Sequence, residues 1–284
     1  MIKGLDARSI RLIAVDLDGT LLTSDKTLAP EGARLLKQAA EEGRHVVLAT
    51  TRNPDSVRPL CRALEISDPI ICTNGAQVWG SPDGPVWVTR SIPRKAGLEI
   101  ARLADRHRWE LSVTVGEMTY LRQRPGQALG PTGAHRMVVS SNADAIVGDP
   151  LRILTWHPDA VEAIRHLRRS KLAHQCTTET YYRADGGVHS LGVFALGADK
   201  GTALDLVLDR LRLEPADVMA IGDNTNDLPM FARARIAVAM SNALDEVKRA
   251  ATAVAPSNDD EGVAWAVRKV GIDAGPTGDL QPTC

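Results

Sequence analysis

Short apolar runs alternate with amphipathic stretches through the first and last thirds of the chain. Each run is apolar almost throughout, as expected of strands that are buried on both faces of a sheet. The expected strands span residues 11–15, 45–49, 69–73, 217–221 and 236–240. Strands that alternate with helices in this way form parallel sheets covered on both faces. The pattern therefore predicts an α/β fold with a Rossmann-like core.

The stretches between these runs carry apolar residues at helical spacing. Proline stands at the start of the first two, residues 30–43 and 54–65, and glycine closes the first. Proline suits the first turn of a helix because its missing N–H has no partner there. In the last third we expect helices over residues 199–213, 227–234, 243–251 and 260–271. From Ile272 onward the sequence predicts a loose tail.

The middle of the chain, residues 84–191, has a different texture. Its apolar runs are shorter, partly alternating and mixed with Arg, Thr and aromatic residues, which favours an antiparallel sheet. Apolar runs occur at 109–115, 119–124, 135–140 and 152–157, and helical patterns at 94–108 and 158–170. Residues 126–135 are expected to form an extended flexible loop. We therefore expect a core of residues 1–84 and 190–284, interrupted by an inserted α+β module over residues 85–189.

Composition and charge limit the class of protein. Of the 284 residues, 44% are hydrophobic and 24% charged, and the formal net charge is −1. These values are typical of a globular protein and argue against a general binder of nucleic acid or membrane. No stretch reaches the roughly 18 apolar residues of a spanning helix, and the start lacks a secretory signal, so we expect a cytoplasmic protein. The four cysteines show no CxxC pair, which predicts buried or idle thiols.

Polar residues gather where the expected parallel strands end. Asp16 and Asp18 follow the first strand, and other strands are followed by Thr50, Thr51, Arg52, Asn74, Asp223, Asn226 and Asp227. In a parallel sheet these ends lie at one edge, where ligands bind. One like-charge pair about 4 Å apart costs about 4 kcal/mol at an effective dielectric near 20. A bound cation would resolve the repulsion, and oxygen ligands without His or Cys favour Mg²⁺.

Lys200 is expected at the start of a helix. A lysine there opposes the helix dipole unless an anion or a carboxylate cluster lies nearby. The alternative, an ordinary surface lysine, stays open from this residue alone.

Four motifs together resemble those of the haloacid dehalogenase (HAD) superfamily. They are DLDGT at 16–20, a threonine that ends the second strand, a lysine at a helix start, and GDNTND at 222–227. The triplet NGA at 74–76 and residues 238–267 further resemble the Cof-type branch. That resemblance implies a cap domain inserted after the third strand, in agreement with the expected module.

The resemblance implies a Mg²⁺-dependent phosphatase. Asp16 would be the nucleophile and form an aspartyl-phosphate, and Asp18 would protonate the leaving oxygen and then activate water. The phosphoryl group would be bound by Thr50, Thr51, Lys200 and Asn226. Mg²⁺ would be held by Asp16, Asp223, Asp227 and the backbone carbonyl of Asp18.

The sequence departs from the branch at two positions. Thr51 stands where the usual Thr-Gly-Arg has glycine, which puts the shape of the pocket in doubt, and Ser241 replaces a usual glycine. Asn74 would face the substrate phosphate or merely turn the chain with Gly75, and Arg52 would reach the crevice or pair with a surface acid. Cap residues that would line a pocket are Arg122, Arg124, His135, Arg136, Tyr182, Arg183 and His189.

The leading hypothesis is hydrolysis of a small phosphorylated metabolite, such as a sugar phosphate or a similar phosphomonoester. A phosphomutase acting on a sugar phosphate is an alternative, and so is a non-catalytic phosphate-binding or regulatory protein. The expected partners exclude nucleic acid and membrane, and the protein is expected to be a monomer or homodimer.

Overall fold

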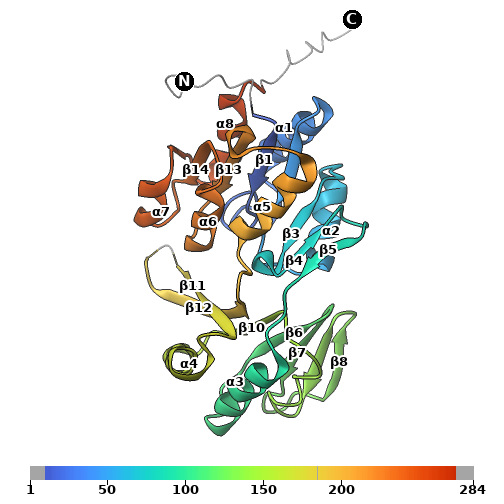
Figure 1. Ribbon diagram of the computed structural model, residues 1–284, viewed down its shortest axis with the longest axis vertical. Coiled ribbons are helices and arrows are strands. Elements are labelled where there is room, and N and C mark those ends of the chain that lie inside the picture. Colours follow the sequence, from blue (N-terminus) through green and yellow to red (C-terminus); the bar gives the residue numbers. More distant parts are fainter. Residues whose placement is uncertain (1–9, 184, 273–284) are drawn as a thin grey trace, which may run out of the picture.

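A computed structural model describes residues 10–183 and 185–272, and the expected tail from residue 273 lies outside them. Its core holds a five-stranded parallel sheet (Figure 1). In spatial order the strands are β15 (Ala253–Ala255), β14 (Ile236–Met240), β13 (Val218–Gly222), β1 (Leu12–Val15) and β2 (His45–Leu48). Four of these were predicted, and β15 was not.

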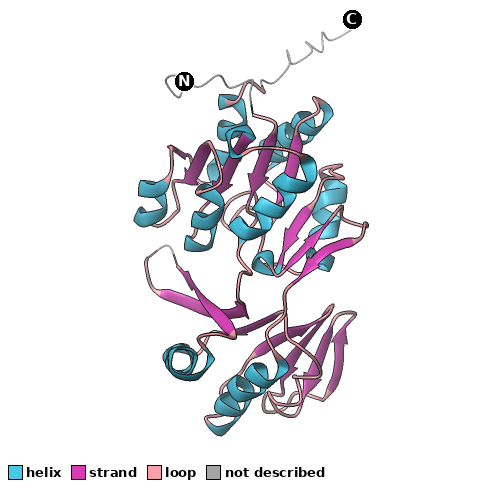
Figure 2. Ribbon diagram, in the orientation of Figure 1, coloured by secondary structure: helices cyan, strands magenta, loops and turns pink. Residues whose placement is uncertain are grey.

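Helices cover both faces of this sheet (Figure 2), as expected of its two-sided apolar strands. Ile13 and Val15 of β1 pack in one cluster with α1 (Pro30–Glu41), α2 (Pro54–Ala63) and α8 (Gly262–Lys269). Leu12 and Ala14 point to the opposite face, toward α5, α6 and α7. The bounds of those helices are Lys200–Leu211 (α5), Leu228–Phe231 (α6) and Asp245–Ala250 (α7). The predicted layers of the core are therefore confirmed.

The third predicted strand, β3 (Ile70–Cys72), has a different role from the one expected. It touches the parallel sheet through one bridge, between Ala49 and Ile71. Its other edge pairs antiparallel with β4 (Gln77–Trp79), which in turn pairs with β5 (Val86–Thr89). The sequence did not predict this hairpin, whose strands are too short to show a clear alternation.

The middle of the chain forms a seven-stranded sheet with two helices, α3 (Arg94–Arg106) and α4 (Pro158–Leu167). The strands, in spatial order, are β11 (Cys176–Tyr182), β12 (Val188–Ala195), β10 (Arg152–Thr155), β6 (Ser112–Val115), β7 (Met118–Arg122), β9 (Arg136–Val139) and β8 (Gly130–Gly133). All neighbours are antiparallel except β7 and β9, which are parallel. The helices and the sheet share one apolar cluster.

Two expectations for this module are corrected. Residues 126–135 contain the strand β8 rather than only a loop, because Gly130 and Pro131 pair with β9. The strands β11 and β12 were also missed, since Thr and Glu alternate in β11 with little apolar content.

Two segments connect the seven-stranded sheet to the core (Figure 1): one follows β5 and the other follows β12. The division at residues 85 and 190 stays a prediction, and strand pairing would place the two boundaries after Thr89 and after Ala195. Within the described residues, no helix is long and apolar enough to cross a membrane.

Candidate active site

Asp16 lies directly after β1 and is joined to a buried lysine. Its backbone N–H donates to the carbonyl of Ile221 on β13, which fixes its place at the end of the sheet. Lys200, the first residue of α5, is fully buried and donates at 2.6 Å to Asp16 Oδ1 and at 2.6 Å to Asp227 Oδ1. Lys200 is therefore not a surface lysine. Its charge interacts unfavourably with the positive end of the α5 dipole, and its ion pairs with the two carboxylates offset this.

Asp223 and Asp227 come from the loop after β13. The second oxygen of Asp227 accepts the backbone N–H groups of Asp223 and Asn224, at 2.9 and 3.0 Å. Asp223 accepts the Thr20 hydroxyl at 3.2 Å. Carboxylate oxygens of Asp16, Asp223 and Asp227 lie within 4.8 Å of one another. Asp227 thus accepts hydrogen bonds on both oxygens. Among the described residues, Asp223 accepts one on Oδ1 only, which leaves Oδ2 available to a ligand.

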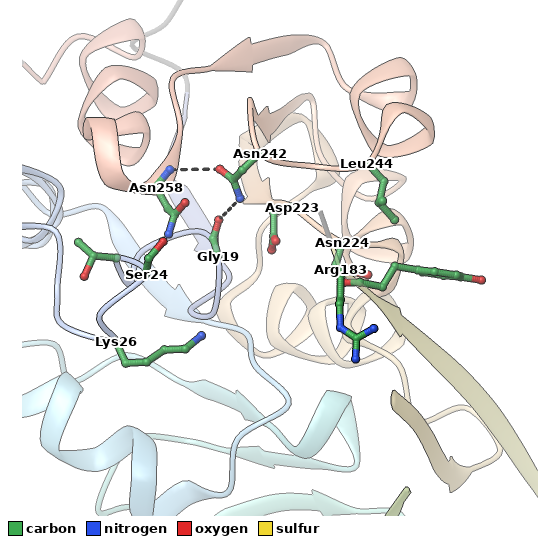
Figure 3. Close-up of a pocket in the computed structure, with 11 residues that line it drawn as sticks. Gly19, Ser24, Lys26, Arg183, Asp223, Asn224, Asn242, Leu244 and Asn258 are labelled. Atoms are coloured by element: carbon green, nitrogen blue, oxygen red, sulfur yellow. Dashed lines mark hydrogen bonds between the residues drawn. The ribbon is translucent and has the colours of Figure 1, made fainter. Parts of the chain in front are cut away.

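The close approach of Asp223 depends on Gly19. This residue has φ +82°, and a Cβ atom there would lie 2.3 Å from Asp223 Oδ2. Any larger side chain would therefore displace the carboxylate. The Asn242 side chain holds the same loop by donating to the carbonyl of Gly19, and it accepts the N–H of Asn258 (Figure 3).

The carboxylate cluster carries more negative charge than Lys200 offsets. Burial raises the pKa of Asp16 to about 7, and the charge of Asp227 adds to this while Lys200 opposes it. Burial also raises the pKa of Asp223 well above its ordinary value, with further contributions from Asp16 and Asp227. Two buried carboxylates and the half-buried one of Asp223 beside one lysine, with oxygen as the only ligand atom, fit a hard divalent cation.

The carboxylate of Asp18 turns away from this cluster. Arg52 Nε lies 2.7 Å from Asp18 Oδ2, and a terminal nitrogen lies 2.8 Å from Oδ1. Lys26 donates to the same Oδ1 at 3.0 Å. Burial alone would raise the pKa of Asp18, but the hydrogen bonds from Arg52 and Lys26 outweigh it and lower the pKa. Of the two alternatives for Arg52, the structure therefore shows the one in which it reaches the crevice, where it pairs with Asp18 rather than with a surface acid.

The expected phosphate ligands lie beside these carboxylates. Thr50 is buried, and its hydroxyl accepts the N–H of Arg52 at 3.1 Å. Asn226 donates through its side chain to Asn74 Oδ1 at 3.1 Å. Asn74 itself is buried in a left-handed conformation, with φ 56°, and turns the chain together with Gly75. The contact with Asn226 shows that Asn74 positions a neighbour; its own contact with a substrate stays a prediction.

A cavity of about 390 Å³ joins the carboxylates to the cap. From the core it is lined by Asp16, Asp18, Gly19, Lys26, Thr51, Asp223, Asn224 and Asn226. From the cap it is lined by Leu154, Trp156, Tyr181, Tyr182, His189 and Ser190. The side chain that Thr51 adds in place of glycine therefore occupies part of this cavity.

Of the seven cap residues named from the sequence, only Tyr182 and His189 line this cavity. Arg183 lines a neighbouring hollow with Lys26 and Asn224 (Figure 3). Arg124, His135 and Arg136 line a second cavity. Arg122 lines none of these and lies 3.8 Å from Asp105.

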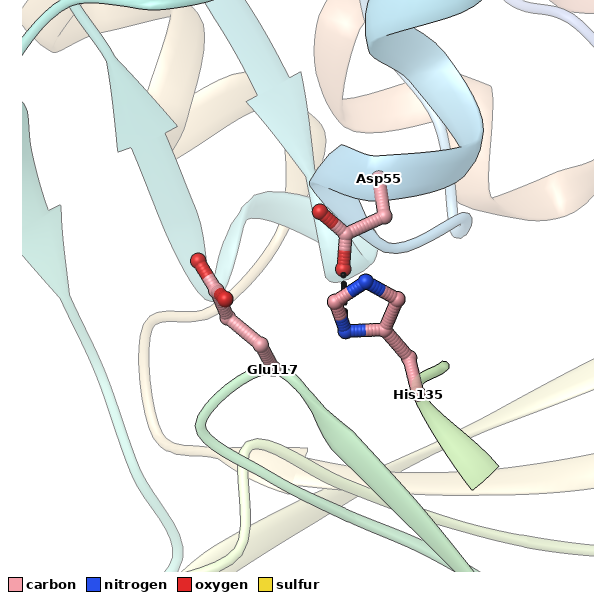
Figure 4. Close-up of side chains that lie close together, drawn as sticks. All are labelled: Asp55, Glu117 and His135. Atoms are coloured by element: carbon pink, nitrogen blue, oxygen red, sulfur yellow. Dashed lines mark ion pairs between the residues drawn. The ribbon is translucent and has the colours of Figure 1, made fainter. Parts of the chain in front are cut away.

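His135 also joins the cap to the core. Its Nδ1 lies 3.1 Å from Asp55 Oδ2 at the start of α2, with Glu117 close by (Figure 4). These three residues could hold a metal ion by distance, but Arg58 already donates to Asp55 at 2.6 Å and lies 4.0 Å from Glu117. We therefore describe the cluster as an ion-pair contact.

Several site residues were missed by the sequence analysis. Lys26 is exposed at the surface and reaches Asp18 from a turn, and Trp156 and Tyr181 line the cavity from the cap. Nothing in their local sequence marks them, because their role depends on how the cap sits over the core. The expected thiols are confirmed as buried for Cys61, Cys72 and Cys176, whereas Cys284 lies outside the described residues.

Comparisons with known proteins agree on one family. A family model described as haloacid dehalogenase-like hydrolase matches residues 13–267. A 5-amino-6-(5-phospho-D-ribitylamino)uracil phosphatase of Bacillus subtilis (strain 168) is 27% identical over 260 residues, covering 91% of this chain and 95% of the relative. A pyridoxal phosphate phosphatase of Escherichia coli (strain K12) is 27% identical over 269 residues, covering 89% of this chain and 96% of the relative.

The fold is also found among solved structures. A haloacid dehalogenase-like hydrolase from Bacteroides thetaiotaomicron superposes with a TM-score of 0.78 at 23% identity. The match covers 92% of this chain and 99% of that one. Both the core and the inserted cap therefore have counterparts in a single known architecture.

Proposed function

Since the chain belongs to the Cof-type branch of the haloacid dehalogenase superfamily and is a phosphatase of small phosphorylated metabolites, we propose that it works through an aspartyl-phosphate on Asp16 and requires Mg²⁺. The observation that supports this most directly is the contact between Asp16 and Lys200. A carboxylate nucleophile at the floor of a cavity has its position fixed at 2.6 Å by a buried cation. The same cation would attract a phosphoryl group into the cavity.

In the first half of the reaction, an oxygen of Asp16 attacks phosphorus while the bond from phosphorus to the leaving oxygen breaks. Asp18 gives its proton to the leaving oxygen. Arg52 and Lys26 favour the ionised form of Asp18 in the free protein. A phosphate dianion next to Asp18 would raise its pKa, since like charges disfavour ionisation. Substrate binding would thus supply the protonated acid that this half-reaction needs.

In the second half, ionised Asp18 takes a proton from water, and that water attacks phosphorus. The bond between phosphorus and Asp16 breaks, which releases inorganic phosphate, restores the carboxylate of Asp16 and leaves Asp18 protonated, as it was before the first half. Here the ion pair with Arg52 is favourable, because it stabilises the form of Asp18 that acts as a base.

Asp16, Asp223 and the backbone carbonyl of Asp18 would hold Mg²⁺, with Asp227 supporting them through its hydrogen bonds to Lys200 and to the loop of Asp223. When bound, the ion would supply positive charge to the phosphoryl oxygens and reduce their repulsion from the carboxylates. Thr50, Thr51 and Asn226 would bind the remaining phosphoryl oxygens, with the Asn226 side chain oriented by Asn74.

The relatives named as phosphatases of 5-amino-6-(5-phospho-D-ribitylamino)uracil and of pyridoxal phosphate support a phosphorylated metabolite as substrate. The cap, which supplies six of the fourteen residues that line the cavity, would select it.

The test uses purified protein and p-nitrophenyl phosphate. We expect release of inorganic phosphate with Mg²⁺ and no measurable release in its absence. The Asp16→Asn variant should lose at least about a thousandfold in kcat, as removal of a nucleophile does. Asn matches Asp in size, so thermal unfolding should confirm that the variant is folded. An active Asp16→Asn variant would contradict the mechanism, and isomerisation of a sugar phosphate without release of free phosphate would favour a mutase.

A further inference from the structure

A second and larger cavity lies against the catalytic one. Its volume is about 790 Å³, and Leu154 and Trp156 line both cavities. Its core wall is the start of α2, from Arg52 to Ser56, and its cap wall comes from the strands around β10. Trp156 stands at the junction with 49% of its surface exposed. The two cavities therefore adjoin at Leu154 and Trp156.

The walls of the second cavity contain polar atoms without partners. Arg152 Nε and Asn53 Oδ1 are both buried and make no hydrogen bond. Their side chains are otherwise engaged, since Arg152 donates to the carbonyl of Thr51 at 2.5 Å and Asn53 donates to Thr119 at 3.2 Å. Buried polar groups in folded proteins nearly always have a partner. Arg152 Nε is a donor that an anion would satisfy, whereas Asn53 Oδ1 is an acceptor and calls for a donor such as a hydroxyl or water.

The charge of the wall specifies the kind of ligand. Four arginines line the cavity, namely Arg52, Arg124, Arg136 and Arg152, against one carboxylate, Asp55, which contacts Arg58 and His135. Arg52 pairs with Asp18, and Arg124 pairs with Glu110 at 2.7 Å. Among the described residues, neither Arg136 nor Arg152 has a carboxylate within 4.0 Å.

Of these two arginines, Arg152 gives the stronger evidence for an anionic ligand. Burial lowers the pKa of its guanidinium, and no nearby carboxylate offsets this. Arg152 is half-buried, and a partly desolvated cation without a counter-ion is unfavourable, so an anion that binds beside it reduces the penalty.

We propose that the second cavity binds an anionic group of the substrate, remote from the scissile phosphate, through Arg136 and Arg152. The group is a carboxylate or a second phosphate, and Trp156 covers the carbon chain between the two ends. This inference rests on the proposed function, because it states which phosphomonoesters the proposed phosphatase prefers.

The test compares probes that differ only at the remote end. D-Gluconate 6-phosphate has a carboxylate at C1, where D-glucitol 6-phosphate has a hydroxymethyl group, and D-glucitol 1,6-bisphosphate has a second phosphate. Each is measured as an inhibitor of p-nitrophenyl phosphate hydrolysis, so that binding counts even without turnover. We expect the anionic probes to bind about tenfold or more tightly than glucitol 6-phosphate, as charge-assisted hydrogen bonds do. The tighter of the two identifies the anion.

The arginine variants assign the effect to residues. Arg136→Ala should remove most of the preference, because Arg136 is exposed and holds no other side chain in place. Arg124→Ala is the matched control, since Arg124 lines the same cavity but is already neutralised by Glu110, and it should retain the preference. Arg152→Gln should also lose the preference for the anionic probes. Because this substitution also removes the hydrogen bond from Arg152 to the Thr51 carbonyl, hydrolysis of p-nitrophenyl phosphate is measured in the same variant to show whether that hydrogen bond is needed for activity.

Equal affinity for charged and uncharged probes in the unmodified protein would overturn the proposal, as would an unchanged preference in Arg136→Ala. If p-nitrophenyl phosphate is not hydrolysed at all, the proposed function fails instead. The same probes are then compared by the rise in melting temperature that they cause, and the same two outcomes decide the subsite.

Discussion

Arg52 and Asp18 form a bidentate ion pair beside the catalytic cavity, with nitrogen-to-oxygen distances of 2.7 and 2.8 Å. The pair links the expected acid and base to the loop that follows β2. It also lowers the pKa of Asp18 against the opposing effect of burial. The proton balance of the proposed reaction therefore depends on an arginine that need not touch the phosphoryl group.

Replacing Arg52 should move the pH dependence of the enzyme. In Arg52→Gln the hydrogen bonds and charge that lower the pKa of Asp18 are largely lost, so the acidic limb of the kcat profile should shift to higher pH. Lys26→Gln is the control, because Lys26 is 60% exposed and screened by water, and its shift should be smaller. A profile that is identical in Arg52→Gln and in the unmodified protein would exclude this role.

Stability of the metal-free protein should fall as the pH rises. The folded-state pKa of Asp16 is about 7, above its ordinary 3.8, and that of Asp223 is also raised. The raised pKa values add to the free energy of unfolding by an amount on the order of a few kcal/mol. This stabilisation is complete below about pH 4 and is lost as the pH rises through about 7. Differential scanning calorimetry from pH 5 to 8 measures this loss.

Added Mg²⁺ should reverse that loss, and most strongly at pH 8, because the ion binds the ionised carboxylates. Asp223→Asn should flatten the pH dependence without metal and weaken the response to Mg²⁺. A melting temperature that rises with pH in the absence of metal would contradict the assignment.

Removal of Lys200 should damage both stability and activity. Lys200→Met keeps the length of the side chain but leaves Asp16 and Asp227 without their shared cation. Loss of one partner from a buried ion pair costs about 3–5 kcal/mol, measured here by urea unfolding at pH 8. The same substitution at exposed Lys26 should change stability by less than about 0.5 kcal/mol. A folded and fully active Lys200→Met variant would contradict the proposed role of Lys200 in positioning Asp16 and binding the phosphoryl group.

Gly19→Ala should weaken the metal site by displacing Asp223. The new Cβ atom would lie 2.3 Å from Asp223 Oδ2 at a φ of +82°. Gly43→Ala is a close control, because Gly43 has φ +86° and nothing within 4 Å of the added atom. Both variants should lose about 1 kcal/mol for the backbone conformation. Only Gly19→Ala should need more Mg²⁺ for half-maximal activity, and equal Mg²⁺ dependence in the two would show that the collision is relieved elsewhere.

The sequence predicted the core because its signals there are local. Apolar runs such as residues 217–221 are long enough to be recognised, and acids directly after a parallel strand must lie at the edge of the sheet. The place of Lys200 beside the carboxylates was implied by the family resemblance, because a lysine at a helix start also fits an ordinary surface position. The β4–β5 hairpin was not predicted because its strands are only three and four residues long, and β12 was not predicted because its neighbour and partner β11 has little apolar content. Arg152 and Trp156 likewise look ordinary until the cap is placed over the core.

The two segments that join the cap to the core have a mechanical consequence. A domain held by two crossings can rotate about the line between them but has little freedom to twist or slide. Opening of the cavity would therefore separate Arg152 of the cap from the carbonyl of Thr51 in the core. Thr51 precedes the arginine that holds Asp18, so each opening would act on the loop that carries both the phosphate ligands and the partner of the acid. An opening that breaks this hydrogen bond and the neighbouring one between Asn53 and Thr119 would remove two contacts from the segment that follows β2.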